Sequence, residues 1–113
     1  MLAKNHLVAP SLLSANFADM RGGINHVHDA GGDWVHLDVM DGQFVPNISF
    51  GSKMVADLRP LSKLPFDVHL MVEKPENIAE NFAKAGADHI IFHYEACVHS
   101  HRLLQRIRSW GKK

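Results

Sequence analysis

Two segments of the chain alternate apolar and polar residues with the period of two that is typical of a β-strand. The first, residues 34–40, sets one group of side chains against another: Val35, Leu37 and Val39 against His36, Asp38 and Met40. The second, residues 66–72, places Asp67, His69 and Met71 on alternate positions in the same way. Because successive strand side chains point to opposite faces, each polar set is expected to share one face.

Two further apolar runs, residues 7–13 and 89–95, also have the length and composition of strands. A segment with helical spacing follows the first of them, and Ser14 or Asn16 is a suitable N-terminal cap for it. Its expected inward face consists of apolar residues at helical spacing: Phe17, Met20, Ile24 and Val27.

Three more helices are expected over residues 52–59, 74–86 and 100–110. Pro60 would end the first of these and Gly86 would close the second. The last helix has an apolar face that is expected to be buried: Leu103, Leu104 and Ile107. Strands and helices in strict alternation predict an α/β protein with a parallel sheet.

The polar face of the predicted sheet distinguishes between two α/β architectures, a sheet covered by helices on both faces and a (β/α) barrel. A sheet covered by helices on both faces has strands that are apolar throughout. Here one face of residues 34–40 and 66–72 is polar towards the C-terminal end. This is typical of a (β/α) barrel, in which active sites lie at the carboxyl ends of the strands.

Composition excludes several classes of function. The 113 residues contain 12 Lys and Arg against 12 Asp and Glu, so a basic surplus that would favour nucleic acid or an anionic membrane is missing. Cys97 is the only cysteine, which rules out a disulfide within the chain. No apolar run approaches the ~20 residues of a membrane helix, and residues 1–6 lack a signal-peptide pattern, so we expect a cytoplasmic location.

The candidate chemistry lies on the polar face of the two alternating strands. His36, Asp38 and His69 offer two imidazoles and a carboxylate, which suit a divalent metal or proton transfer. Taken singly, each histidine would be an ordinary core or rim residue. Their matching positions on the two strands, close to the carboxylate of Asp38, favour a role as metal ligands instead. Asp67 stays unassigned, and His93 and Glu95 are expected to form a hydrogen bond with each other.

Several strings of residues carry a resemblance to a known family. They are residues 9–14 (APSLLS), 36–42 (HLDVMDG), 44–47 (FVPN), 67–72 (DVHLMV), 85–88 (AGAD) and 92–96 (FHYEA). Together they extend from about Ala9 to Gly111, and the segment from His36 to Asn47 is the most specific. On these motifs the chain resembles the ribulose-phosphate 3-epimerase family.

The resemblance implies a (β/α)8 TIM barrel that interconverts D-ribulose 5-phosphate and D-xylulose 5-phosphate through an enediolate. It implies that His36, Asp38 and His69 bind one divalent metal ion, for which such mixed ligands suit zinc, iron, manganese or cobalt. Asp38 would be one of two acid/base carboxylates. Ser11 and His69 would contact the sugar phosphate, and Met40 and Met71 would lie beneath the intermediate.

The length is about half of what the implied barrel requires. A (β/α)8 barrel takes about 250 residues, whereas residues 1–113 supply about four βα units and form a single partial domain, an N-terminal half-barrel. The resemblance implies that the second acid/base carboxylate and the phosphate-binding loops lie beyond this stretch. We therefore expect exposed inner residues such as Leu7 and Ile91, self-association or pairing with a missing C-terminal half, and little activity of these 113 residues alone.

Three functions remain open from the sequence. The first is the epimerase, with this chain as part of it. The second is a catalytically incompetent half-barrel that binds a metal or pairs with another chain. The third is another sugar-phosphate barrel, such as an isomerase of amino-acid biosynthesis, which would not need the face formed by His36, Asp38, Met40, His69 and Met71.

Overall fold

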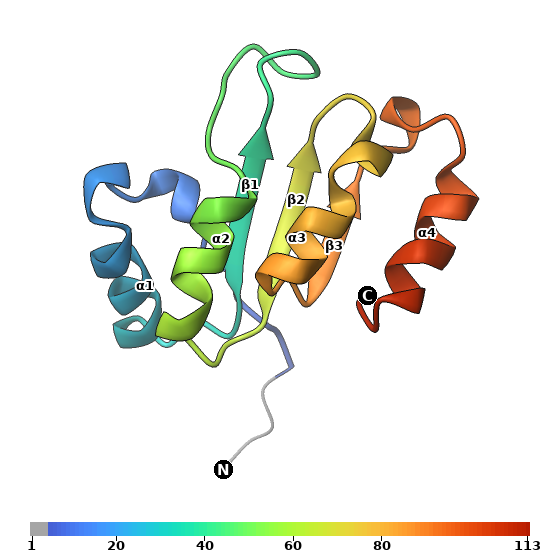
Figure 1. Ribbon diagram of the computed structural model, residues 1–113. Coiled ribbons are helices and arrows are strands. Elements are labelled where there is room, and N and C mark those ends of the chain that lie inside the picture. The colour runs from blue at the N-terminus through green and yellow to red at the C-terminus, as the bar shows by residue number, and fades with distance from the viewer. Residues whose placement is uncertain (1–4) are drawn as a thin grey trace.

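The computed structural model describes residues 5–113 and contains one parallel sheet. Residues 1–4 lie outside the described part, and with them most of the segment used for the signal-peptide prediction. The sheet has three strands in the order β1 (Val35–Met40), β2 (Phe66–Met71) and β3 (His89–Phe92) (Figure 1). Parallel strands joined by helices confirm the predicted α/β class.

Four α-helices alternate with the strands along the chain. One precedes β1 and one follows each strand: α1 (Met20–Asp29), α2 (Ser52–Leu58), α3 (Ala79–Ala85) and α4 (Ser100–Ser109). Figure 1 shows α2 and α3 side by side over the sheet, with α1 next to α2 and α4 at the β3 end. The core lies between these helices and the apolar face of the strands, where Val35, Leu37, Val68 and Leu70 are fully buried. The opposite sheet face carries the polar groups.

Short 3₁₀ turns replace the first turns of two predicted helices. The helix expected from Ser14 or Asn16 begins as a turn at Phe17–Asp19, which Asn16 caps through Ala18 N, and α1 starts only at Met20. The predicted burial of Phe17 is wrong, since 40% of it is exposed. Likewise Pro75–Asn77 forms a turn before α3, and Gly86 closes α3 with a φ of 114°, as predicted.

The predicted strand over residues 7–13 is wrong. This segment runs beside β1, where Val8 O accepts a hydrogen bond from Asp33 N and Pro10 O accepts one from His36 N. It forms a single bridge, between Ser11 and His36, and not a continuous strand. Pro10 has no N–H to give to a ladder. The Ser11 hydroxyl then accepts from Leu13 N, which starts a 3₁₀ turn at Leu12–Ser14.

The C-terminal predictions also needed correction. β3 ends at Phe92 rather than at residue 95, because Tyr94–Ala96 folds into a 3₁₀ turn. In α4, Leu103 and Ile107 are buried, but Leu104 is 46% exposed. One residue advances a helix by about 100°, so Leu104 points away from the side that Leu103 presents to the core.

The two apolar side chains that were predicted to be exposed, one before the sheet and one on β3, are indeed open to solvent. Leu7 is 61% exposed and Ile91 is 42% exposed. Among residues 5–113, the backbone hydrogen bonds at the outer edge of β3 come from Lys113, whose N donates to Asp88 O and whose O accepts from Ile90 N. Within residues 5–113, no helix has the length and apolar character needed to span a membrane.

Candidate metal centre and active site

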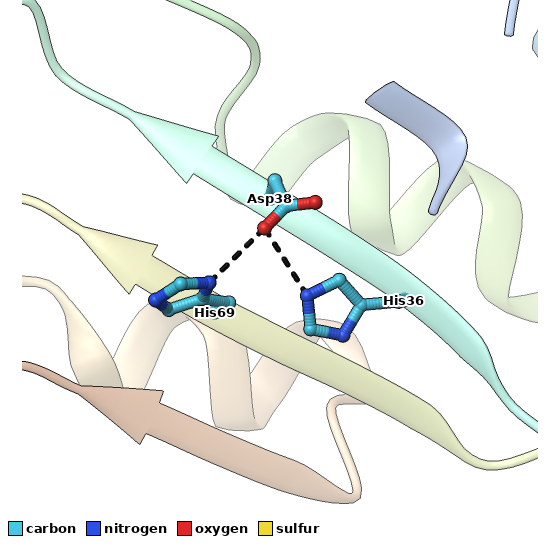
Figure 2. Close-up of side chains that lie close together, drawn as sticks. All are labelled: His36, Asp38 and His69. Carbon is cyan, nitrogen blue, oxygen red and sulfur yellow. Dashed lines mark hydrogen bonds and ion pairs between the residues drawn. The ribbon is translucent and has the colours of Figure 1, made fainter. Parts of the chain in front are cut away.

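Three of the predicted site residues meet on the polar face of the sheet. His36 and Asp38 project from β1, and His69 projects from β2, where it is the register partner of Asp38. Their potential ligand atoms all lie within 4.8 Å of one another. Figure 2 shows both imidazoles directed at the same carboxylate: Asp38 Oδ1 lies 3.1 Å from His36 Nε2 and 3.0 Å from His69 Nδ1.

The second carboxylate oxygen of Asp38 is held by Ser11. The Ser11 hydroxyl donates to Asp38 Oδ2, because the bridge between Ser11 and His36 brings the N-terminal segment alongside β1. Burial raises the pKa of Asp38, but the Ser11 hydrogen bond, the charge of His36 and the contacts with both imidazoles lower it below the ordinary value of 3.8. Asp38 is therefore a carboxylate at neutral pH and is able to accept a proton.

Two further residues contact the imidazoles from outside. Asp67 Oδ2 lies 2.8 Å from His36 Nδ1, and His93 Nε2 lies 2.8 Å from His69 Nε2. His93 and Glu95, which were predicted to share a hydrogen bond, approach each other at an ion-pair distance instead, with Nδ1 and Oε1 3.4 Å apart. The sequence placed Asp67 on the polar face but gave no sign of its partner, because that partner depends on the register between β1 and β2.

The two methionines predicted to lie under the substrate are register partners. Met40 and Met71 pair across β1 and β2, two positions beyond the Asp38–His69 pair towards the carboxyl ends of the strands, and both are partly buried. They therefore lie on the same sheet face as the polar cluster. Their contact with an intermediate stays a prediction.

The loop after β1 is anchored by Asp41. Its carboxylate accepts from the backbone N–H groups of Gln43 and Phe44 within the loop and of Glu73 after β2. Burial raises the pKa of Asp41, but these N–H groups lower it below the ordinary value of 3.8. The hydrogen bond from Glu73 connects the segments that follow β1 and β2, and Gly42, with a φ of 72°, lets the chain turn directly after Asp41.

The donor set fits a divalent metal ion. Two imidazole nitrogens and a carboxylate oxygen converge from two strands, and these are ligand types that transition metals and zinc accept. The same carboxyl has a lowered pKa, so it is ionised at neutral pH and available as a ligand. Fold and site together define an α/β protein with a candidate metal-binding group of two imidazoles and one carboxylate on one face of its parallel strands.

Comparison with known proteins agrees with this class. The model of the ribulose-phosphate 3-epimerase family matches residues 7–113, so the chain belongs to that family. The chain is 54% identical over 99% of its length to a ribulose-phosphate 3-epimerase of Synechocystis, and 52% identical over 94% to one of Bacillus subtilis. An Arabidopsis thaliana relative, 50% identical over 95%, is described as chloroplastic, so a cytoplasmic location stays a prediction.

The chain spans about half the length of the curated relatives it matches. It covers 50% of the Synechocystis protein, 49% of the Bacillus protein and 39% of the Arabidopsis protein. This agrees with the expectation that residues 1–113 correspond to part of a larger fold. The family match also favours the epimerase over other sugar-phosphate barrels.

Proposed function

We propose that this chain is the N-terminal half of a (β/α)8 barrel that interconverts D-ribulose 5-phosphate and D-xylulose 5-phosphate. The observation that carries the proposal is the convergence of His36, Asp38 and His69 on one face of β1 and β2, in a chain of the ribulose-phosphate 3-epimerase family. The three parallel strands with helices on one face support this proposal, because the wall of such a barrel has the same arrangement. The reaction belongs to the whole protein, of which this chain provides one part.

In this proposal His36 Nε2, Asp38 Oδ1 and His69 Nδ1 hold one divalent ion, either zinc, iron, manganese or cobalt. Such an ion supplies Lewis-acid stabilisation of negative charge that develops on oxygens of the sugar. The cluster is only partly exposed, with 14% of the Asp38 side chain and 19% of the His36 side chain accessible. Electrostatic interactions are stronger there than in bulk water.

Asp38 takes the proton from C3 of the sugar in one direction and returns it in the other. Its lowered pKa keeps it ionised before the transfer, and the Ser11 hydroxyl fixes Oδ2. A positioned base of this kind contributes about 10²–10⁴-fold to the rate. Inversion at C3 also requires a proton donor on the opposite face of the planar enediolate. We assign this second acid, and the phosphate-binding loops, to the part of the family's length that this chain does not cover.

In this proposal the sugar is contacted by four residues close to Asp38 or on the same sheet face: Ser11, His69, Met40 and Met71. Ser11 and His69 offer polar atoms to the substrate. Met40 and Met71 offer polarisable sulfur, which suits a flat intermediate with delocalised charge. The family match leads us to propose a five-carbon ketose phosphate as the small-molecule partner.

A second candidate function rests on the open sheet. Leu7 and Ile91 are exposed, and β3 has a free edge apart from Lys113. Such a surface favours pairing with another chain, either a second copy or a complementary half-barrel. In this reading the 113 residues bind metal without turning over substrate.

Solvent-deuterium exchange at C3 of D-ribulose 5-phosphate tests the proposal. We expect no exchange with the 113-residue chain alone. We expect exchange when it is fused to the C-terminal half of the Bacillus subtilis relative, and its loss in the same fusion with Asp38→Asn. A matched Asp57→Asn fusion, altered at an exposed carboxylate of α2, should stay active. A folded fusion that binds metal but does not exchange C3 would contradict the epimerase and leave the second candidate.

A further inference from the structure

The two imidazoles of the site present different ring nitrogens to Asp38. His36 points Nε2 at Asp38 Oδ1, whereas His69 points Nδ1 at the same oxygen. In Figure 2 the second nitrogen of each ring faces away from the carboxylate. A neutral imidazole carries one proton, and only the nitrogen without it can bind a cation. Each ring therefore needs a defined tautomer, and the two tautomers are opposite.

Asp67 is the hydrogen-bond partner that favours one tautomer of His36. Its Oδ2 lies 2.8 Å from His36 Nδ1, and the residue is 8% exposed, so the carboxylate is held inside the protein. An ionised carboxylate only accepts hydrogen bonds. His36 Nε2 faces Asp38 Oδ1 at 3.1 Å, and a cation bound between these two atoms needs the lone pair of Nε2. The proton of His36 then lies on Nδ1, where Asp67 accepts it.

His93 is the hydrogen-bond partner that favours the opposite tautomer in His69. Its Nε2 lies 2.8 Å from His69 Nε2, the two rings are 5.0 Å apart and nearly parallel, and Phe44 lies against the His93 ring at 4.8 Å. Glu95 Oε1, 3.4 Å from His93 Nδ1, favours a proton on that nitrogen. His93 Nε2 is then an acceptor. A cation bound between His69 Nδ1 and Asp38 Oδ1, which lie 3.0 Å apart, leaves the proton of His69 on Nε2, from where it is donated to His93.

We propose that Asp67 and His93 are positioning residues that fix opposite tautomers in His36 and His69 and so create the pair of lone pairs that binds the ion. This inference rests on the proposed metal site and adds how the site is prepared. Outer hydrogen-bond partners of metal-binding histidines typically contribute 10–100-fold to metal affinity. Neither residue touches the sugar in this arrangement, and both act through the ring that they contact.

The test uses the 113-residue chain with zinc as the probe. Nitrogen-15 NMR of the zinc-loaded chain identifies the nitrogen that carries the proton in each ring. We expect it on Nδ1 of His36 and on Nε2 of His69. Zinc affinity, measured by competition with a chromophoric chelator, should fall about 10–100-fold in Asp67→Asn and in His93→Phe. The matched controls Asp57→Asn and His101→Phe alter an exposed carboxylate and an exposed imidazole and should leave affinity unchanged.

The outcomes separate this inference from the proposed function. If the wild-type chain binds no zinc, the metal site and the inference both fail. If zinc binds, but the protons lie on the other nitrogens, or zinc is bound by His93 itself, only the inference fails. The same holds if Asp67→Asn and His93→Phe, shown to be folded by circular dichroism, bind zinc as tightly as their controls. The NMR measurement needs no variant, so a variant that fails to fold does not decide the result.

Discussion

The stability of the sheet beneath the site depends strongly on one guanidinium group. Arg59 follows α2 and donates four hydrogen bonds to acceptors on two different loops: 2.7 Å to Ser62 O, 2.7 Å to Leu64 O, 3.1 Å to Gly86 O and 2.9 Å to Asp88 Oδ2. Its Cζ also lies 3.7 Å from the centroid of the Phe66 ring at the start of β2. Arg59 thus ties the loop that enters β2 to the turn that enters β3.

Arg59→Lys should break much of this arrangement while keeping the charge. An ammonium group has three donors on one nitrogen and cannot reach both loops as the planar fork does. Two carbonyls then lose their partner at about 1 kcal/mol each, and the lost stacking on Phe66 adds about 0.5–1 kcal/mol. The pair with Asp88 adds little, because 46% of that side chain is exposed. We expect a loss of about 2–3 kcal/mol in the free energy of unfolding.

Urea unfolding followed by circular dichroism measures this loss. The matched control is Arg108→Lys, an exposed arginine on α4 that should change stability by less than about 0.5 kcal/mol. A loss below about 1 kcal/mol for Arg59→Lys, or one equal to the control, would refute the reasoning.

Three further predictions concern the turns and the site. Gly86→Ala forces φ of 114° on a residue with a Cβ, 2.4 Å from Arg59 Cδ, and should cost about 1–3 kcal/mol in urea unfolding; an unchanged midpoint would contradict this. Ser11→Ala should raise the pKa of Asp38 in a carbon-13 NMR titration, and an unchanged pKa would disprove the role of the hydroxyl. Asp41→Asn should cost about 1 kcal/mol at neutral pH. Since the folded pKa of Asp41 lies below 3.8, that cost should vanish as the pH falls through it, whereas a constant cost would count against the argument.

The central strands and the three converging residues were predictable because they depend on a local pattern. The period of two in residues 35–40 and 66–71 determines which side chains share a face. It therefore placed His36, Asp38 and His69 together without knowledge of the rest of the fold. The same pattern assigned Asp67 to this face but could not say which residue it contacts.

The sequence predictions were wrong or incomplete where contacts between distant residues, or the backbone chemistry of one residue, determine the local structure. The segment before Ser11 has the composition of a strand, but Pro10 cannot donate to a ladder, and the Ser11 side chain starts a turn. His93 was read as a partner of Glu95 alone, because its approach to His69 depends on how β3 lies against β2. Such inter-strand geometry leaves no signal within a window of a few residues.

Zinc stoichiometry after equilibrium dialysis tests the central claim most directly. The claim is that His36, Asp38 and His69 form one cation site, and it predicts one tightly held zinc ion per chain. It further predicts loss of that ion in His36→Ala and in His69→Ala, and its retention in His101→Ala, which removes an exposed imidazole on α4. Equal zinc content in all four proteins, or none in the wild-type chain, would contradict the account.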